Sequence, residues 1–141
     1  MFEVVVVGTD GSDTAGMAVR EAAELVRSRN GTLHVVSSYR PVSSRTIEGG
    51  GEQWTIMPED RVDAVLEESA ALARILGVNV EVHASRSDPA AAILRVAKEV
   101  KADVVVVGNK GMKGAKRFLL GSVPSKVAHD APCAVLIIKT T

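Results

Sequence analysis

Two runs of four valines, each ending at a glycine, constrain the fold of this chain more than any other feature of its sequence. Val4–Val7 leads into Gly8, and one hundred residues later Val104–Val107 leads into Gly108. Unbroken apolar runs, rather than alternating apolar and polar residues, predict strands that are buried on both faces, as in a parallel sheet covered by helices. A glycine directly after such a strand predicts a tight turn whose backbone N–H groups can approach a ligand, because no Cβ stands in the way.

The segments between the apolar runs carry apolar residues at every third or fourth position, which is typical of helices that bury one face. The expected strands are Val4–Val7, Thr32–Ser37, Val78–Val82, Asp103–Val107 and Ala134–Ile138, and the expected helices span Thr14–Arg29, Glu59–Leu76, Pro89–Val100 and Ser122–Asp130. Strands and helices therefore alternate along the chain. This order predicts an α/β fold of five parallel strands, doubly wound with right-handed crossovers, in a single domain over residues 1–141.

One segment, Arg40–Met57, departs from this alternation. It contains Gly49–Gly51 and the sole tryptophan, Trp54. A loop of this length in a compact domain is more often mobile or functional than structural. We therefore treat it as a candidate link between ligand binding and protein partners.

The charge balance and the cysteine count exclude several classes of protein. Lys plus Arg and Asp plus Glu both number 17, so no net charge attracts nucleic acid or an anionic membrane, and self-association is permitted. The single cysteine, Cys133, excludes an intrachain disulfide and fits a reducing compartment. No signal peptide is recognisable, and no apolar run approaches the roughly 20 residues that span a bilayer. We expect a cytoplasmic protein.

Polar residues follow both valine runs and fit a ligand that carries phosphate. In a doubly wound sheet, ligands bind at the carboxyl ends of the strands, where the winding direction reverses. The matching sequences suggest that the two strands are central neighbours, which would bring Asp10 and Lys110 to one crevice. Asp10 can accept hydrogen bonds from ribose hydroxyls or hold a metal through water, and Lys110 can meet a phosphate.

The segment from Gly108 to Gly121 is basic although the whole chain is neutral. Its charged residues are Lys110, Lys113, Lys116 and Arg117, with no acidic residue among them. Gly121-Ser122 then begins the last helix, whose free N–H groups and dipole favour an anion, and the Ser122 hydroxyl adds a donor. The competing interpretation is that these glycines serve only strand-ending turns and close packing. The acid-free basic stretch favours the phosphate interpretation.

Three better-known phosphate-binding arrangements do not match. The P-loop string, Gly with four residues and then Gly-Lys-Ser or Gly-Lys-Thr, is absent, and the spacings Gly8 to Gly11 and Gly108 to Gly111 are wrong for the dinucleotide fingerprint. A phosphoacceptor receiver domain would need an aspartate at the end of the third strand, where this chain has His83-Ala84-Ser85. The site must therefore be of another kind.

The glycine series resembles that of the universal stress protein family. Gly108, two residues, Gly111, nine residues, Gly121 and then Ser122 is the spacing of the ATP-binding subgroup of that family. Thr9-Asp10-Gly11-Ser12 and Leu33-His34-Val35 also resemble the family's first two strands, and the likeness extends over nearly the whole chain. Gly8 stands where many members have proline.

The resemblance implies a Rossmann-like fold of the adenine nucleotide alpha hydrolase-like kind, with strand order 3-2-1-4-5, and a homodimer that pairs through Ala134–Ile138. It implies that Asp10 lies on the ribose or adenine side, that backbone near Val35 contacts adenine, and that the glycine series holds ribose and phosphates. The predicted nucleotide-binding residues are Gly8, Thr9, Asp10, Val35, Val107, Gly108, Lys110, Gly111, Gly121, Ser122 and Val123. Mg²⁺ or Mn²⁺ in such a site is carried mainly by the phosphates.

From these features we expect an ATP-binding regulatory module of the stress response. Some actinobacterial members of the family prefer cyclic AMP, so a cyclic AMP sensor or sink stays open. A slow ATPase that uses Asp10 and Mg²⁺ and a scaffold that binds no nucleotide also stay open. No catalytic or metal-ligating residue is assigned, because His34, His83 and His129 lack a metal spacing and Cys133 has the setting of a small buried residue.

Overall fold

The computed structural model describes residues 2–40, 57–109 and 120–140. In chain order the strands are β1 (Val4–Gly8), β2 (Thr32–Arg40), β3 (Met57–Pro58), β4 (Asn79–Ser85), β5 (Val104–Gly108) and β6 (Ala134–Ile138). The helices are α1 (Asp13–Arg27), α2 (Glu59–Ile75), α3 (Pro89–Glu99) and α4 (Ser122–Asp130). Strands and helices alternate as the sequence predicts, except for the added β3.

The five main strands form one parallel sheet in the order β4-β2-β1-β5-β6. This is the predicted order 3-2-1-4-5 once the two-residue β3, which pairs only with the end of β2, is set aside. The two valine runs are central neighbours, with Val7 of β1 opposite Val106 of β5. Their carboxyl ends therefore lie side by side at one edge of the sheet.

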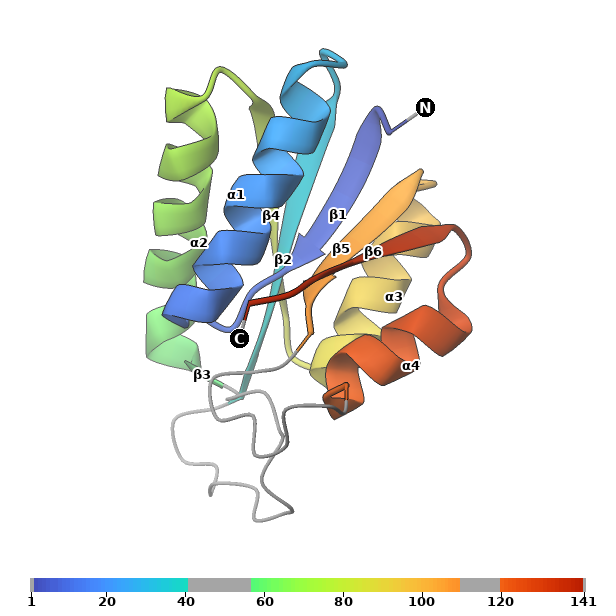
Figure 1. Cartoon of the computed structure of the whole chain (residues 1–141). Coiled ribbons are helices and arrows are strands. Elements are labelled where there is room, and N and C mark those ends of the chain that lie inside the picture. The colour runs from blue at the N-terminus through green and yellow to red at the C-terminus, as the bar shows by residue number, and fades with distance from the viewer. Residues whose placement is uncertain (1, 41–56, 110–119, 141) are drawn as a thin grey trace.

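Helices cover both faces of the sheet, with α1 and α2 on one side and α3 and α4 on the other (Figure 1). Successive valines of β1 point to opposite faces, so Val5 and Val7 pack beneath α1 and α2, while Val6 packs with α3 and α4. The same division holds for Val104 and Val105 of β5. Two apolar layers flank the central strands, which explains why these strands contain no polar residue.

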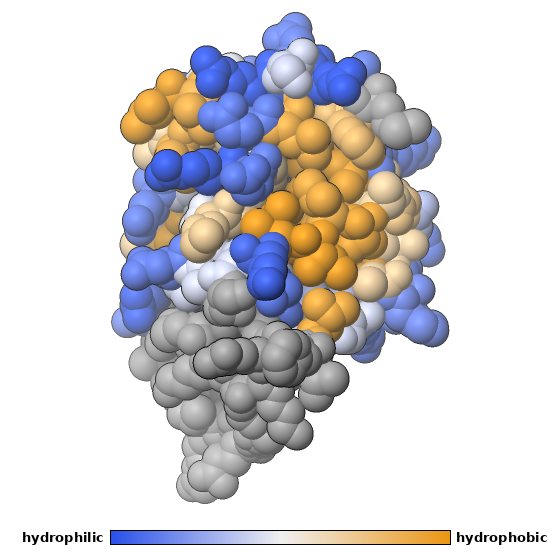
Figure 2. Space-filling view, viewed as in Figure 1, coloured by the Kyte–Doolittle hydropathy of each residue, from blue (hydrophilic) through white to orange (hydrophobic). Residues whose placement is uncertain are grey.

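The two outer strands are more exposed than their sequences predict. Val82 of β4 is 45% exposed and Leu136 of β6 is 39% exposed, because each strand has a neighbour on one side only and is incompletely covered by helices. Burial on both faces, expected for every strand, is therefore wrong for β4 and β6. Figure 2 shows apolar surface gathered over β6.

Some predicted boundaries are also wrong. β2 runs to Arg40 rather than Ser37, and β4 starts at Asn79 and runs to Ser85 rather than spanning Val78–Val82. Both extensions consist largely of polar residues and carry no apolar signal. Ser38 pairs with Ser85, and the last two residues of β2 pair with β3. The expected loop Arg40–Met57 begins with the last residue of β2 and ends in β3, and residues 41–56 lie outside the described residues.

The helix ends lie within two residues of the predicted ones: α1 spans Asp13–Arg27 rather than Thr14–Arg29, and α2 and α3 each end one residue before the predicted end. The Ser12 hydroxyl caps α1 by accepting a hydrogen bond from the N–H of Ala15, and Asp88 caps α3 in the same way ahead of Pro89. Gly77 follows α2 with a φ of +75°, a conformation that glycine adopts without strain. Within the described part of the chain, no helix is long and apolar enough to cross a membrane.

Candidate ligand site at the carboxyl edge of the sheet

The turn after β1 is held tightly against β2. The N–H of Thr9 donates to the carbonyl of Val36 at 2.9 Å, and the Ser37 hydroxyl donates to the carbonyl of Thr9 at 2.8 Å. Gly11 then has a φ of +82°, which lets the chain reverse into α1. Thr9 and Asp10 are consequently buried at the edge of the sheet, in fixed positions.

Asp10 is 5% exposed, yet only one of its carboxylate oxygens has a partner in the described structure. Oδ1 accepts hydrogen bonds from the backbone N–H of Ser12 at 3.0 Å and from the Ser12 hydroxyl at 2.5 Å. Oδ2 is buried and has no hydrogen-bond partner among the described residues. A buried carboxylate oxygen without a partner is unfavourable, so Oδ2 can accept a hydrogen bond from a ligand.

The second part of the candidate site consists of the end of β5 and the start of α4. Gly108 is buried beside the end of β6, and the N–H of Gly121 donates to the carbonyl of Asn109 at 3.0 Å. This bond brings the start of α4 to the end of β5. Gly121 is the N-cap of α4 and provides no side-chain cap, so the helix end presents backbone N–H groups.

The predicted site residues divide into three groups. The structure brings Gly8, Thr9, Asp10, Gly108, Gly121 and Ser122 to the ends of β1 and β5 and the start of α4. Val35, Val107 and Val123 are buried, and their side chains belong to the two apolar layers, so only their backbone can serve a ligand. Lys110 and Gly111 lie outside the described residues.

Several polar residues at this edge escaped prediction. Ser12 orients Asp10, Ser37 fixes Thr9, and Thr140 bonds to Asn109. For Ser12 the signal was present, because a hydroxyl at a helix start two residues after an aspartate is typical of a cap. No local pattern indicates the roles of Ser37 and Thr140, since both act on residues distant in sequence.

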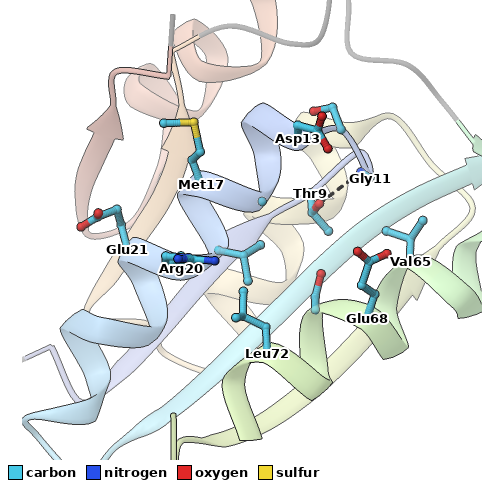
Figure 3. Close-up of a pocket in the computed structure, with 13 residues that line it drawn as sticks. Thr9, Gly11, Asp13, Met17, Arg20, Glu21, Val65, Glu68 and Leu72 are labelled. Carbon is cyan, nitrogen blue, oxygen red and sulfur yellow. Dashed lines mark hydrogen bonds between the residues drawn. The ribbon is translucent and has the colours of Figure 1, made fainter. Parts of the chain in front are cut away.

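A groove of about 540 Å³ lies on the other side of the β1–α1 turn, between α1 and α2 (Figure 3). Its lining includes Val19, Val65 and Leu72. Arg20 lies between the two helices (Figure 3). Of the predicted site residues that the structure describes, only Thr9 lines it. Gly11 and Ser12 of the same turn also line the groove, so it adjoins the candidate site, and the Thr9 hydroxyl accepts the Gly11 N–H at 3.1 Å.

Two histidines that seemed scattered in the sequence are neighbours in the fold. His34 Nδ1 and His83 Nε2 are 3.0 Å apart across β2 and β4, and Glu81 Oε2 lies 3.8 Å from His34 Nδ1. Burial is the main cause that lowers the pKa of His34, opposed by Glu81 and assisted by His83. Within residues 2–40, 57–109 and 120–140, no three His, Cys, Asp or Glu side chains are grouped to hold a metal ion.

Cys133 is half-buried at the start of β6 and is not arranged as a nucleophile. Burial raises the pKa of its thiol, and the nearby Asp103 carboxylate raises it further. A raised pKa reduces the thiolate fraction near neutral pH, which is the reactive form. The interpretation of Cys133 as a packing residue is consistent with this environment.

The strand order makes this chain a doubly wound α/β protein. Its candidate site lies at the carboxyl ends of β1 and β5, where the winding direction of the sheet reverses and where proteins of this class bind their ligands. The profile of the universal stress protein family matches residues 1–139. The chain belongs to the universal stress protein family. Universal stress protein Rv1636 of Mycobacterium tuberculosis is 34% identical over 144 residues, covering 99% of this chain and 98% of that protein.

Two solved structures of similar proteins contain adenine nucleotides. A universal stress protein in complex with cAMP has a TM-score of 0.77 and 34% identity, covering 97% of this chain and 96% of that one. The universal stress protein of Archaeoglobus fulgidus in complex with dAMP has a TM-score of 0.70 and 30% identity, covering 96% of this chain and 97% of that one.

Proposed function

We propose that this protein is an adenine-nucleotide-binding regulatory module, with ATP as its ligand. The observation that carries the proposal is the buried Oδ2 of Asp10 at the end of β1, which has no partner in the part of the chain that the structure describes. It stands at the same sheet edge as Gly108 and the uncapped start of α4. An acceptor for ribose hydroxyls beside donors for phosphate matches the two chemically distinct parts of a nucleotide.

The glycine series supports the phosphate half of this assignment. Gly121 leads directly into α4, and a side chain there would occupy space next to the helix N–H groups. Ser122 is exposed and adds a hydroxyl donor at the first position of the helix. Lys110 is proposed to neutralise phosphate charge, and Mg²⁺ or Mn²⁺ would be held chiefly by the phosphates of the nucleotide.

Cyclic AMP is the second candidate ligand, and one observation favours it. The similar structure with a TM-score of 0.77 is a complex with cAMP. The basic stretch Lys110–Arg117 favours ATP instead, because a triphosphate has more negative charge to neutralise than a cyclic monophosphate. With cAMP as the ligand, the protein would act as a second-messenger sensor or sink.

We further propose a homodimer that pairs through β6. This strand is at the edge of the sheet, and its free side presents backbone groups to solvent along with the exposed Leu136. An edge strand with apolar side chains pairs readily with a second copy. The near-zero net charge of the chain does not oppose such pairing.

The first test is to denature freshly purified protein and to identify any released nucleotide by mass spectrometry. Recovered ATP would support the main proposal, and recovered cAMP would support the second candidate. If neither is recovered, the emptied protein is titrated calorimetrically with both nucleotides. Absence of binding to either at millimolar concentration would refute nucleotide binding and leave the scaffold interpretation.

Two substitutions test where the ligand binds. Gly121→Val fills the phosphate space, and Asp10→Ala removes the ribose acceptor, so each is expected to weaken binding at least tenfold. Ser122→Thr keeps the hydroxyl and is the matched control, with affinity close to that of the wild type. Unchanged affinity in both Gly121→Val and Asp10→Ala would mean that the nucleotide binds elsewhere.

A turnover assay separates binding from catalysis. Asp10 is the sole candidate that we name for activating a water molecule on ATP, and its described partners are the backbone and hydroxyl of Ser12. We therefore expect phosphate release no faster than in a protein-free control containing Mg²⁺. Turnover that is lost in Asp10→Asn while binding persists would instead establish a slow ATPase.

A further inference from the structure

The end of β5 is tied to the C-terminal segment of the chain by one side chain, that of Asn109. Its Oδ1 accepts two hydrogen bonds from the same residue: one from the N–H of Thr140 at 2.8 Å and one from the Thr140 hydroxyl at 3.1 Å. The two residues are 31 positions apart and partly buried. Thr140 lies beyond β6, so the contact joins the carboxyl ends of two neighbouring strands.

The backbone of Asn109 makes two more connections. Its N–H donates to the carbonyl of Ile138 at 2.8 Å, and its carbonyl accepts the N–H of Gly121 at 3.0 Å. Asn109 is therefore the junction of three segments: the end of β5, the end of β6 and the start of α4. We call this set of four hydrogen bonds the Asn109 junction.

The junction lies inside the glycine series, although Asn109 is not one of the residues predicted to bind nucleotide. Asn109 directly follows Gly108, and its carbonyl holds Gly121, so it fixes how far apart the two ends of the series stand. The side-chain bonds in turn hold Asn109 to Thr140, in the segment after β6. Removing Oδ1 would leave two partly buried donors of Thr140 without a protein acceptor, which is unfavourable.

We propose that Asn109 positions the backbone of Gly121 and the start of α4, which we call the phosphate cradle. Thr140 anchors the Asn109 side chain. The C-terminal segment after β6 then controls nucleotide affinity without contacting the nucleotide. The control acts on the phosphate-dependent part of binding, because the junction sets the position of Gly121 and the start of α4 but not that of Asp10. This inference rests on the proposed binding of an adenine nucleotide.

The test compares variants of the anchor, which leave the glycine series unchanged. Thr140→Ala removes one donor, and Thr140→Ser keeps both. By calorimetry with nucleotide-free protein, we expect Thr140→Ala to bind ATP about fivefold more weakly, the loss that corresponds to one hydrogen bond, and Thr140→Ser to bind within about twofold of the wild type. Asn109→Ala, which loses both bonds, is expected to bind ATP at least tenfold more weakly.

Adenosine serves as the probe without phosphate and separates positioning from a general loss of structure. Positioning predicts that Asn109→Ala and Thr140→Ala lose affinity for ATP while affinity for adenosine changes less than twofold. A general loss of structure would weaken both ligands equally and would overturn the proposal. Thermal unfolding of each variant is measured alongside, and if Asn109→Ala does not fold, the Thr140 pair decides the question.

The failure of this inference differs from the failure of the proposed function. Wild-type protein that binds neither ATP nor cAMP would overturn both together. Wild-type protein that binds nucleotide, with Asn109→Ala and Thr140→Ala binding equally well, would overturn only the role of the junction.

Discussion

Single residues at the ends of the strands have the strictest geometric requirements in this molecule. Gly31 precedes β2, and a Cβ at this position would stand 2.0 Å from the carbonyl oxygen of Glu3, far inside van der Waals contact. That carbonyl accepts the N–H of Thr32 at 2.8 Å, so it cannot retreat without breaking a bond between β1 and β2. Only glycine therefore fits at position 31, where the chain passes close to the backbone of β1.

Gly31→Ala is accordingly expected to destabilise the protein by about 3 kcal/mol, the upper range of an overpacking substitution. The measurement is the free energy of unfolding in urea. Gly16→Ala is the matched control, since nothing lies within 4 Å of a Cβ there and the residue is inside α1. We expect the control to gain roughly 0.5–1 kcal/mol. Equal effects of the two changes would contradict the described contact with Glu3.

His34 makes stability depend on pH. Its pKa is lowered in the folded state, chiefly by burial, so the unfolded chain binds the proton more readily. The stabilisation is complete above the ordinary pKa of 6.5 and is lost as the pH falls from there towards the lowered value, by no more than about 1.4 kcal/mol per pH unit. Glu81 and His83 face the ring and modify the shift without reversing it.

The check is urea unfolding between pH 7.5 and 5.5 for the wild type and two variants. His34→Asn should reduce the slope of stability against pH below 6.5. His129→Asn replaces a histidine whose side chain is 87% exposed and lies outside the His34–His83 pair, so it is the comparison variant. A wild-type protein that becomes more stable as the pH falls through this range would show that the sign is wrong.

At the scale of elements, the helix caps do different work at different places. Ser12 caps α1 and also donates to Asp10 Oδ1, so the same hydroxyl starts a helix and orients a site carboxylate. Asp88 caps α3 through the N–H of Ala91 and is not part of the candidate site. Both side chains cap a helix, but only Ser12 also forms a hydrogen bond with a residue of the candidate site.

Removing each cap should therefore separate stability from binding. Ser12→Ala and Asp88→Ala are each expected to cost about 1 kcal/mol of unfolding free energy, the usual effect of losing a cap. Only Ser12→Ala should also weaken nucleotide binding, because Asp10 loses a hydrogen bond that holds its orientation. Calorimetric titration of both variants is the measurement, and an equal loss of affinity in both would argue against a specific role for Ser12.

On the scale of the whole molecule, the sheet has two edges that differ in character. β4, at one edge, carries exposed charged and polar residues such as Glu81 along with the exposed Val82. β6, at the other edge, is entirely apolar and includes the exposed Leu136. Charged residues discourage pairing of edge strands, so the apolar edge is the one that suits the proposed pairing with a second copy.

Leu136→Lys is expected to convert dimers to monomers, since a charge would be placed at the pairing surface. Val82→Lys, an equivalent change at the opposite edge, should leave the dimer intact. Sedimentation velocity over a range of protein concentrations measures both. A wild type that sediments as a monomer throughout, or a dimer that only Val82→Lys disrupts, would refute pairing through β6.

Much of this architecture could be predicted because its causes are local. The valine runs predicted the two central strands, and the spacing of apolar residues predicted the four helices to within two residues at each end. The added length of β2 and β4 could not be predicted, since Ser38 pairs with Ser85, and Ala84 with Ser37, without any apolar pattern. Pairing between distant strands, not propensity, extends those elements.

By itself the sequence determined the order of the layers, the central position of the valine strands and the edge of the sheet at which the candidate site lies. Burial of apolar side chains dictates these features, and it follows from the pattern of residue types. Only the tertiary structure decided which atoms meet there: the unpaired Oδ2 of Asp10, the contact of His34 with His83, and the bond from Thr140 to Asn109. Hydrogen bonds are directional and short, so they depend on how distant segments are placed in space, which no local pattern in the sequence records.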